Sequence, residues 1–329
     1  MPMKLMRVLV THMLAAIGLT VSSVANAQTC SWTVSSLNFG AVDTLSVANV
    51  DATATVNITC SGFLNLLVLG SQVRVCPNIG SGSGGATASA RQLDSTGNKL
   101  NYQLYTDAGH STVWGSDFWA FPQGPPALIV SLNLAGSGSL SETLYGRVFG
   151  AQSTAPPGSY TSVFSGVDAQ LRYQQYLLLA PPCSTGLGAA ANTTFTVSAS
   201  VSPNCLVSAT TLAFGTEGVL STNTDATNAI DVRCTAGTPW TASLNAGSGT
   251  GGTVNLRRMT GPGGATVAYT IYRNAGRTEV WGDGTAGTQT VSGTGTGSAQ
   301  PQTGYGRVPP QATPAPATYS DTIVVTVTY

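Results

Sequence analysis

An internal repeat constrains this chain more than any other feature, because two copies of one sequence pattern indicate two copies of one fold. The tetrapeptides LNFG and LAFG follow Cys30 and Cys205 at the same distance. Blocks that begin with DAT end at Cys60 and Cys234. Farther along, each half carries a pair of tyrosines followed by AG and WG dipeptides, and then the tripeptide YGR. Matched blocks in the same order predict two domains of one architecture, and a length of 329 residues accommodates them.

Composition and alternation indicate that both copies consist of β-strands. Gly accounts for 39 of the residues and charged residues for only 8%, while Thr, Ser and Val are abundant. Residues 321–329 are rich in β-branched side chains, and residues 194–201 alternate between apolar and polar side chains. Segments rich in Gly and Ser lie between such runs and are typical of turns. The sequence therefore predicts an all-β chain of two tandem β-sandwiches.

Residues 1–27 have the pattern of a signal peptide. Lys4 and Arg7 precede an apolar run over residues 8–21, and the tripeptide ANA ends at Ala27. The apolar run is short for a hydrocarbon core of about 30 Å, which argues against the alternative of a retained membrane anchor. We expect export and cleavage after Ala27.

Export makes a disulfide framework the natural interpretation of the six cysteines. Six cysteines allow 15 pairings, so spacing alone does not decide among them. The repeat does, because Cys30–Cys60 and Cys205–Cys234 occupy matched positions, and each pair is predicted to close a loop within its own copy. The remaining pair is Cys76–Cys183, which would tie the end of the first copy back to its middle.

Several functional classes are disfavoured by composition. Lys and Arg together number 13, as do Asp and Glu, so the chain lacks the basic surface that a nucleic-acid-binding protein needs. No cysteine pair has CxxC spacing, and His110 is the single histidine after residue 27, which argues against a metal site. Arg277 occupies the position of His110 in the other copy, so histidine-dependent catalysis is also disfavoured. We expect no enzymatic activity, no cofactor and no metal.

The repeated blocks resemble a known family. The cysteine followed by LxFG, the DAT block, the tyrosine and WG block and the final YSDT…TVTY strand resemble the spore coat protein U domain, the subunit fold of archaic, Csu-type chaperone–usher pili. The resemblance is strong over residues 192–329 and weaker but clear over residues 30–173. It implies immunoglobulin-like sandwiches, of which the second is incomplete and is completed by donor-strand complementation. It also implies a periplasmic chaperone, an outer-membrane usher and an adjacent pilin subunit as partners.

Residues 193–201 lie just before Cys205, where this family carries its donor strand. Phe195, Val197, Ala199 and Val201 share one face of the segment, and we expect them to fill the groove of the first copy in cis. The alternative is that the segment is the first strand of the second domain. After cleavage only Gln28 and Thr29 would precede Cys30, too few to pair along a neighbour's groove, so we expect a tip subunit rather than a repeating shaft subunit.

Three apolar stretches of the first copy have no counterpart in the second, namely residues 63–69, 118–122 and 176–182. Loops are normally polar because they face water, and clustered apolar loops mark an interaction site. Tip adhesins of the resembled family carry hydrophobic loops of this kind, which implies contact with a hydrophobic or abiotic surface. The candidate surface-binding residues are Phe63, Leu66, Leu67, Phe118, Trp119, Phe121, Tyr176, Leu177 and Leu178. The alternative is burial in the core or between the domains.

These inferences give one overall prediction. The domains expected are a signal peptide over residues 1–27, an adhesin-like sandwich over 28–190, a linker and candidate donor strand over 191–203, and a pilin domain over 204–329. The predicted function is that of a pilus-tip adhesin at the cell surface that mediates attachment and biofilm formation. The alternatives are a structural protein of the outer surface or spore coat, and a minor pilus adaptor with no adhesive role.

Overall fold

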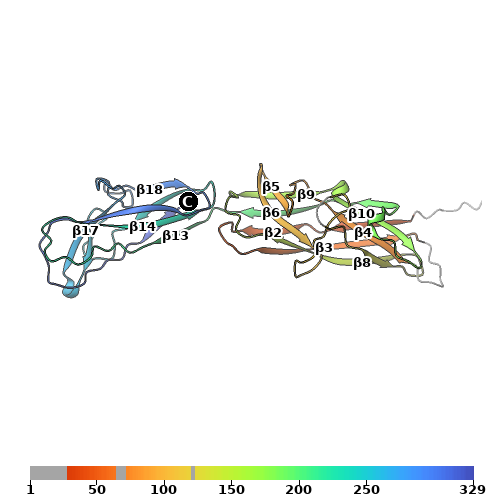
Figure 1. Cartoon of the computed structure of the whole chain (residues 1–329), viewed down its shortest axis with the longest axis horizontal. Coiled ribbons are helices and arrows are strands. Elements are labelled where there is room, and N and C mark those ends of the chain that lie inside the picture. Colours follow the sequence, from red (N-terminus) through yellow and green to blue (C-terminus); the bar gives the residue numbers. More distant parts are fainter. Residues whose placement is uncertain (1–27, 64–71, 120–122) are drawn as a thin grey trace, which may run out of the picture.

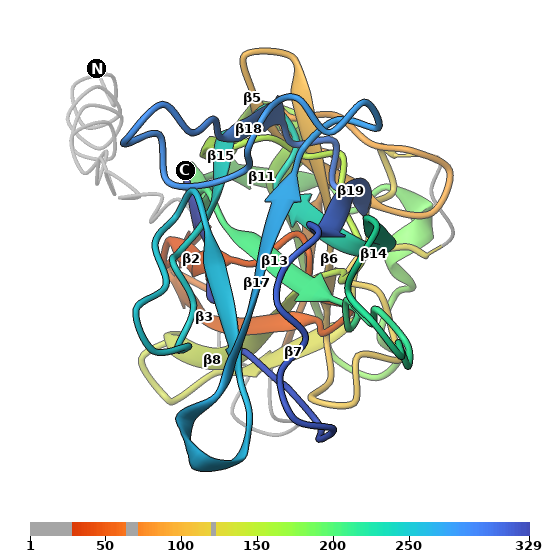
Figure 2. The ribbon, with the colours of Figure 1, turned by 90° about the vertical axis from the view of Figure 1, so that its left-hand side faces the viewer.

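The computed structural model of the chain describes residues 28–63, 72–119 and 123–329, which form two β-sandwiches arranged end to end (Figure 1). Figure 2 looks along the long axis with the second sandwich in front of the first. The all-β prediction is confirmed, and the helical elements within these ranges are single turns of 3-10 helix. No helix in the described ranges is long and apolar enough to cross a membrane. The predicted signal peptide lies outside the described residues.

The first sandwich packs an eight-stranded sheet, in the order β1-β3-β8-β6-β5-β9-β12-β2, against a four-stranded sheet, in the order β11-β10-β4-β7. Its strands are β1 Thr29–Val34, β2 Leu37–Val42, β3 Val50–Ser61, β4 Gln72–Ile79, β5 Arg91–Ser95, β6 Asn98–Tyr105, β7 Leu128–Ser131, β8 Gly138–Val148, β9 Gly158–Phe164, β10 Ala169–Tyr176, β11 Ala189–Asn192 and β12 Phe195–Val201. Alternate residues of β1, β3 and β9 are buried, as expected for strands with one face on the core.

The second sandwich packs a five-stranded sheet, β13-β14-β19-β17-β16, against a three-stranded sheet, β18-β15-β20. Its strands are β13 Cys205–Ala209, β14 Thr224–Cys234, β15 Pro239–Leu244, β16 Arg257–Thr260, β17 Thr266–Tyr272, β18 Val291–Thr294, β19 Gln300–Val308 and β20 Val325–Thr328. Each of these strands occupies the place of one strand of the first sandwich. Four strands of the first sandwich, β2, β9, β11 and β12, have no strand in the matching place among residues 205–329.

The repeat extends to a pair of buried arginines that sequence analysis does not single out. Arg91 and Arg257 are fully buried and donate hydrogen bonds to backbone carbonyls at matched positions, including those of Trp114 and Trp281. Burial disfavours the charged guanidinium and lowers the pKa of Arg91 to about 10. These arginines replace water as hydrogen-bond donors to the ends of interior strands, where carbonyls would otherwise be unsatisfied.

Three disulfides hold the fold. Cys30–Cys60 and Cys205–Cys234 each join the first strand of a sandwich to its neighbour in the sheet. Cys76–Cys183 ties β4 to the connection between β10 and β11. In the chain-entropy model such closures stabilise by about 3–5 kcal/mol each.

The connection between the sandwiches is short, because β12 ends at Val201 and β13 begins at Cys205. Asn204 donates from its side-chain amide to the carboxylate of Asp43 in the first sandwich, over 3.3 Å. The loop around Asp43 therefore marks the end of the first sandwich that faces the second.

Candidate functional site

The place in the first sandwich between β2 and β9 is filled by β12. This strand runs antiparallel to β9 over its whole length and parallel to β2. Phe195, Val197, Ala199 and Val201 all point into the core and are at most 4% exposed. The ring of Phe195 stacks on that of Phe164 with centroids 4.6 Å apart. The interpretation of this segment as the first strand of the second domain is therefore wrong.

The matching place in the second sandwich is an open groove, which we call the acceptor groove. It has a volume of about 960 Å³ and is bounded by residues 209–218 on one side and 313–323 on the other. Its apolar lining consists of Leu212, Phe214, Leu220, Ile230, Leu244, Met259, Val267, Ile271, Val308, Ile323 and Val325. No strand among the described residues occupies the position that β12 holds in the first sandwich.

The burial that β12 provides is seen by comparing the exposure of matched residues in the two sandwiches. In the first sandwich Leu37 and Tyr160 are fully buried. Their counterparts Leu212 and Tyr319 are only half-buried. The same holds for the pair of Phe164, fully buried, and Ile323, half-buried. The acceptor groove thus exposes side chains that its twin buries.

The two walls of the acceptor groove lack strand structure. Residues 210–218 and 317–323 contain no assigned strand, although their counterparts form β2 and β9. The pairing of Thr260 with Ser320 persists as an isolated bridge, in the place where β5 meets β9 in the first sandwich. Because β12 is the hydrogen-bonding neighbour that β2 and β9 share, the lack of a matching strand leaves the groove-side edges of both walls without a ladder partner.

One wall of the groove nevertheless keeps a fixed geometry. The Tyr319 hydroxyl donates to the carbonyl of Ala315, as the Tyr160 hydroxyl does to that of Pro156. The Asp321 carboxylate accepts hydrogen bonds from the backbone N–H of Gly249 and from the hydroxyl of Tyr269, at 2.9 and 2.8 Å. Burial raises the pKa of Tyr269, and the hydrogen bond to the carboxylate raises it further. The wall is therefore held in place while its strand edge is free.

The predicted surface loops do not share one environment. Phe63 is 5% exposed and its ring packs edge-on against Tyr173 at 6.3 Å, so its assignment to a surface-binding loop is wrong. The backbone at Phe63 is fixed by a hydrogen bond from its N–H to the carbonyl of Gly136, and its side chain belongs to the core of the first sandwich. Leu66, Leu67 and Phe121 lie outside the described residues.

Phe118 and Trp119 lie over arginines on the flank of the first sandwich. The ring of Phe118 is 44% exposed and sits 5.3 Å from the guanidinium carbon of Arg172. Trp119 is half-buried, and its ring sits 4.6 Å from the guanidinium carbon of the buried Arg91. The geometry gives Trp119 a packing role, as the cover of a buried cation.

The segment after β10 carries the most exposed apolar side chains near the predicted loops. Leu177, Leu178 and Leu179 are 39%, 86% and 87% exposed. Tyr176, also predicted to bind a surface, is half-buried, and its hydroxyl donates to the side-chain carbonyl of Gln72.

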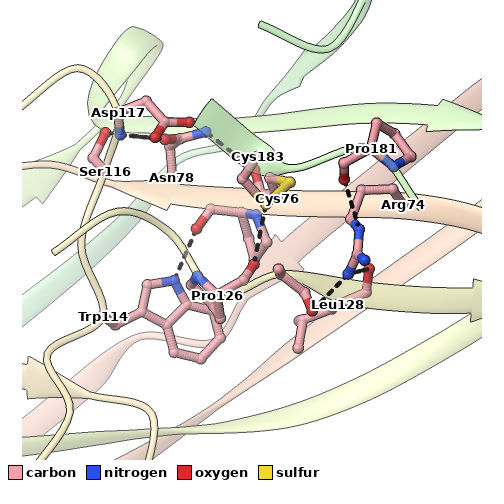
Figure 3. The surroundings of a disulfide bond; sticks show 12 residues. Arg74, Cys76, Asn78, Trp114, Ser116, Asp117, Pro126, Leu128, Pro181 and Cys183 are labelled. Carbon is pink, nitrogen blue, oxygen red and sulfur yellow. Dashed lines mark hydrogen bonds between the residues drawn. A yellow bond between two sulfur atoms is a disulfide. The ribbon is translucent and has the colours of Figure 1, made fainter. Parts of the chain in front are cut away.

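Alternate residues of β4 anchor two segments to the four-stranded sheet, namely the segment that follows β10 and the loop that carries Phe118 (Figure 3). Arg74 donates to the carbonyl of Pro181 at 3.1 Å, and Cys76 forms the disulfide to Cys183. Asn78 accepts from the backbone N–H of Asp117 at 2.7 Å and so holds the loop that leads to Phe118. Sequence analysis missed Arg74 and Asn78. The spacing of two residues from each to Cys76 was the available signal, because it places all three on one face of a strand.

A further exposed leucine lies at the same end of the molecule. Gln72 pairs with Tyr176 on one side and with Ser131 on the other, so the turn after β7 and the leucine segment leave the sheet together. That turn presents Leu134, which is 79% exposed. Residues 177–179 and Leu134 thus form what we call the apolar end, which lies away from the second sandwich (Figure 1).

Known proteins give both a sequence and a structural match. A family model described as Spore Coat Protein U domain matches residues 16–166 and 191–326. The structure is similar to that of the CsuC–CsuE chaperone–tip adhesion subunit pre-assembly complex from archaic chaperone-usher Csu pili of Acinetobacter baumannii, at 16% identity and a TM-score of 0.53, over 92% of this chain and 100% of that one. A second match is the CupB6 tip adhesin from Pseudomonas aeruginosa, at 12% identity and a TM-score of 0.39, over 91% and 94% of the two chains. No curated protein matches the sequence.

The likeness to the Acinetobacter structure, at this identity, shows a shared fold over 92% of this chain and the whole of that one. Within residues 28–63, 72–119 and 123–329, no group of three His, Cys, Asp or Glu side chains is placed to hold a metal ion.

Proposed function

The chain belongs to the Spore Coat Protein U domain family, and from this premise we propose that it is a pilus subunit whose second sandwich is completed by a strand of another protein. The observation that carries the proposal is the contrast between the two copies. The same position is filled by β12 in the first sandwich and is an open groove in the second. An incoming strand would form backbone hydrogen bonds with the groove-side edges of both walls, and its alternate side chains would fill the apolar floor.

The same contrast supports a place at the tip of the fibre. A repeating subunit has to donate a strand to its neighbour. In this chain the segment in that role, β12, is already paired along its whole length within the first sandwich. We therefore propose a subunit that accepts a strand through its second sandwich and carries the first sandwich at the outer end. The partners proposed are a periplasmic chaperone before assembly, an outer-membrane usher during it, and an adjacent pilin subunit in the fibre.

Co-expression with a periplasmic pilus chaperone encoded beside this gene tests the proposal. We expect a 1:1 complex, because the chaperone would cover the acceptor groove and the exposed edges that otherwise favour aggregation. Leu212→Asp should abolish capture, since it puts a charge on the apolar wall, whereas Thr222→Asp, at an exposed residue outside the groove lining, should leave capture intact. A stable chaperone-free monomer, with no complex formed by either variant or by the unchanged protein, would contradict the proposal.

We further propose that the apolar end contacts hydrophobic surfaces and so supports attachment and biofilm formation. Burying a large apolar side chain gains about 1.5–3 kcal/mol whatever the chemistry of the surface. The low charge of the chain helps, because little charged surface is desolvated on contact. A single tip would bind weakly, because the ordering of its loops costs free energy on contact. Many fibres on one cell would raise the overall binding strength through avidity.

Leu178→Ser combined with Leu179→Ser should reduce the attachment of piliated cells to polystyrene several-fold while the number of pili stays constant. The reason is that these two side chains are the most exposed leucines of the apolar end. Val47→Ser is the matched control, because Val47 is 83% exposed but lies in the loop near Asp43, at the end that faces the second sandwich. Equal attachment of the double variant and the control would favour the alternative roles of adaptor or structural surface protein. We propose no catalytic role for any of these residues.

A further inference from the structure

We infer that the segment that enters the acceptor groove has two parts, and that its first part pairs with the free edge of β20 before its second part crosses to fill the groove. The inference rests on the proposed function and defines the partner segment at the same site. It comes from the first sandwich, where one continuous stretch of this chain, residues 189–201, completes both sheets.

The first part of that stretch is β11, which extends the four-stranded sheet. It runs antiparallel to β10, with Tyr173 opposite Ala189 and Gln170 opposite Asn192. The backbone N–H of Thr193 then donates to the carbonyl of Ala169 at 3.0 Å, which fixes the crossover. From Phe195 the chain continues as β12 in the opposite sheet. A single segment therefore supplies an edge to one layer and a filling strand to the other.

The register identifies β20 as the counterpart of β10. The indole of Trp114 donates to the carbonyl of Pro77, and that of Trp281 donates to the carbonyl of Ala242, so these two carbonyls are equivalent. Leu171 of β10 pairs with Pro77, and Val327 of β20 pairs with Ala242. Val327 thus takes the place of Leu171.

The outer edge of β20 is open. It is the last strand in the order β18-β15-β20, and no strand within residues 205–329 lies where β11 lies beside β10. An unpaired edge next to a groove of the same sandwich is a template for an incoming strand.

A second observation points to the same missing part. In the first sandwich Trp32 of β1 is 4% exposed, and its indole donates to the carbonyl of Ala191 in β11 at 3.2 Å. The counterpart of Trp32 is Val207 of β13, which is 43% exposed. β11 contacts β1 in the first sandwich, whereas the matching flank of β13 has no such cover among the described residues. The missing cover and the open edge adjoin each other, and one short strand would fill both places.

The template defines the chemistry of the partner segment. Its first part has small apolar side chains at alternate positions, as Ala189 and Ala191 have, because these pack on the core beneath β1. Its second part has apolar side chains at four alternate positions, with polar or small residues between them, as β12 has. The third of them is small, because Ala199 lies opposite Tyr160, whose counterpart Tyr319 lines the acceptor groove. The occupant is thus an extended segment of another subunit with this pattern.

Extensions fused after Tyr329 test the inference in the full chain. Each extension begins with a Gly/Ser linker as long as the connection from Gln174 to Gly188. The full extension then repeats residues 189–201 of this chain. The matched extension is identical except that Gly-Ser-Gly-Ser replaces the part that copies Ala189 to Asn192, and a third variant carries the linker alone. Backbone hydrogen exchange is measured peptide by peptide in all three.

We expect both extensions to slow exchange in the groove walls, residues 212–218 and 317–323, relative to the linker alone. The full extension alone should also slow exchange at residues 326–328 and 206–208, by about tenfold or more, because only it supplies hydrogen bonds to the β20 edge and cover for β13. Equal exchange at residues 326–328 in both extensions overturns the two-part segment and leaves the acceptor groove standing. Unchanged exchange in the groove walls with both extensions contradicts the proposed function itself.

Discussion

Val197→Asp should unfold the first sandwich and leave the second sandwich folded. Val197 is fully buried at the centre of β12, opposite Ser162 of β9 and Leu37 of β2. An unpaired carboxylate at this position costs several kcal/mol on top of the lost packing. A domain of this size is stable by only about 5–15 kcal/mol in total, so one such charge removes most of that margin.

Ser198→Asp is the matched control, because Ser198 is the next residue of the same strand and lies on its half-buried outer face. Thermal unfolding followed by circular dichroism should show the loss of one cooperative transition in the Val197 variant and two unchanged transitions in the Ser198 variant. If both variants unfold like the unchanged protein, β12 does not complete the first sandwich.

Much of the fold follows from sequence because the repeat and the alternation constrain it directly. Matched cysteines occupy the first strand and its neighbour in each sandwich, and the strand register places Cys30 opposite Cys60 and Cys205 opposite Cys234. The apolar face of residues 195–201 is the face that the core buries. A period of two in the sequence specifies which face of a strand is buried, although it does not specify which domain supplies the core.

The environment of the loops does not follow from sequence, because an apolar run has the same composition whether it is buried or exposed. Phe63 packs on Tyr173 and Trp119 covers Arg91, and both contacts join residues far apart in the chain. Leu178 and Leu179 are exposed, although they belong to an equally apolar run. Tertiary partners decide these cases, and no local pattern identifies the partners.

The buried arginines and β11 illustrate a second limit. Arg91 donates to the adjacent carbonyls of Ile79 and Gly80 and to that of Trp114 in a separate segment, so its role is defined only once those two segments meet. β11 is a run of alanines and an asparagine with low strand propensity, and it is a strand because β10 offers it an edge. The edge that β20 leaves open is likewise a property of the assembled sheet, in which β20 is the last strand, and no local pattern in the sequence specifies it.

Hydrogen exchange of the unmodified chain tests most directly whether one sandwich is filled and its twin is open. The walls of the first groove, residues 37–42 and 158–164, share the ladder of β12, whereas residues 212–218 and 317–323 lack such a partner. We expect the first pair of segments to exchange more slowly by at least about three orders of magnitude, since protection in a core strand can approach a global stability of ~5–15 kcal/mol. Equal protection of the two pairs would show that the second sandwich is closed in the isolated protein and would contradict the account.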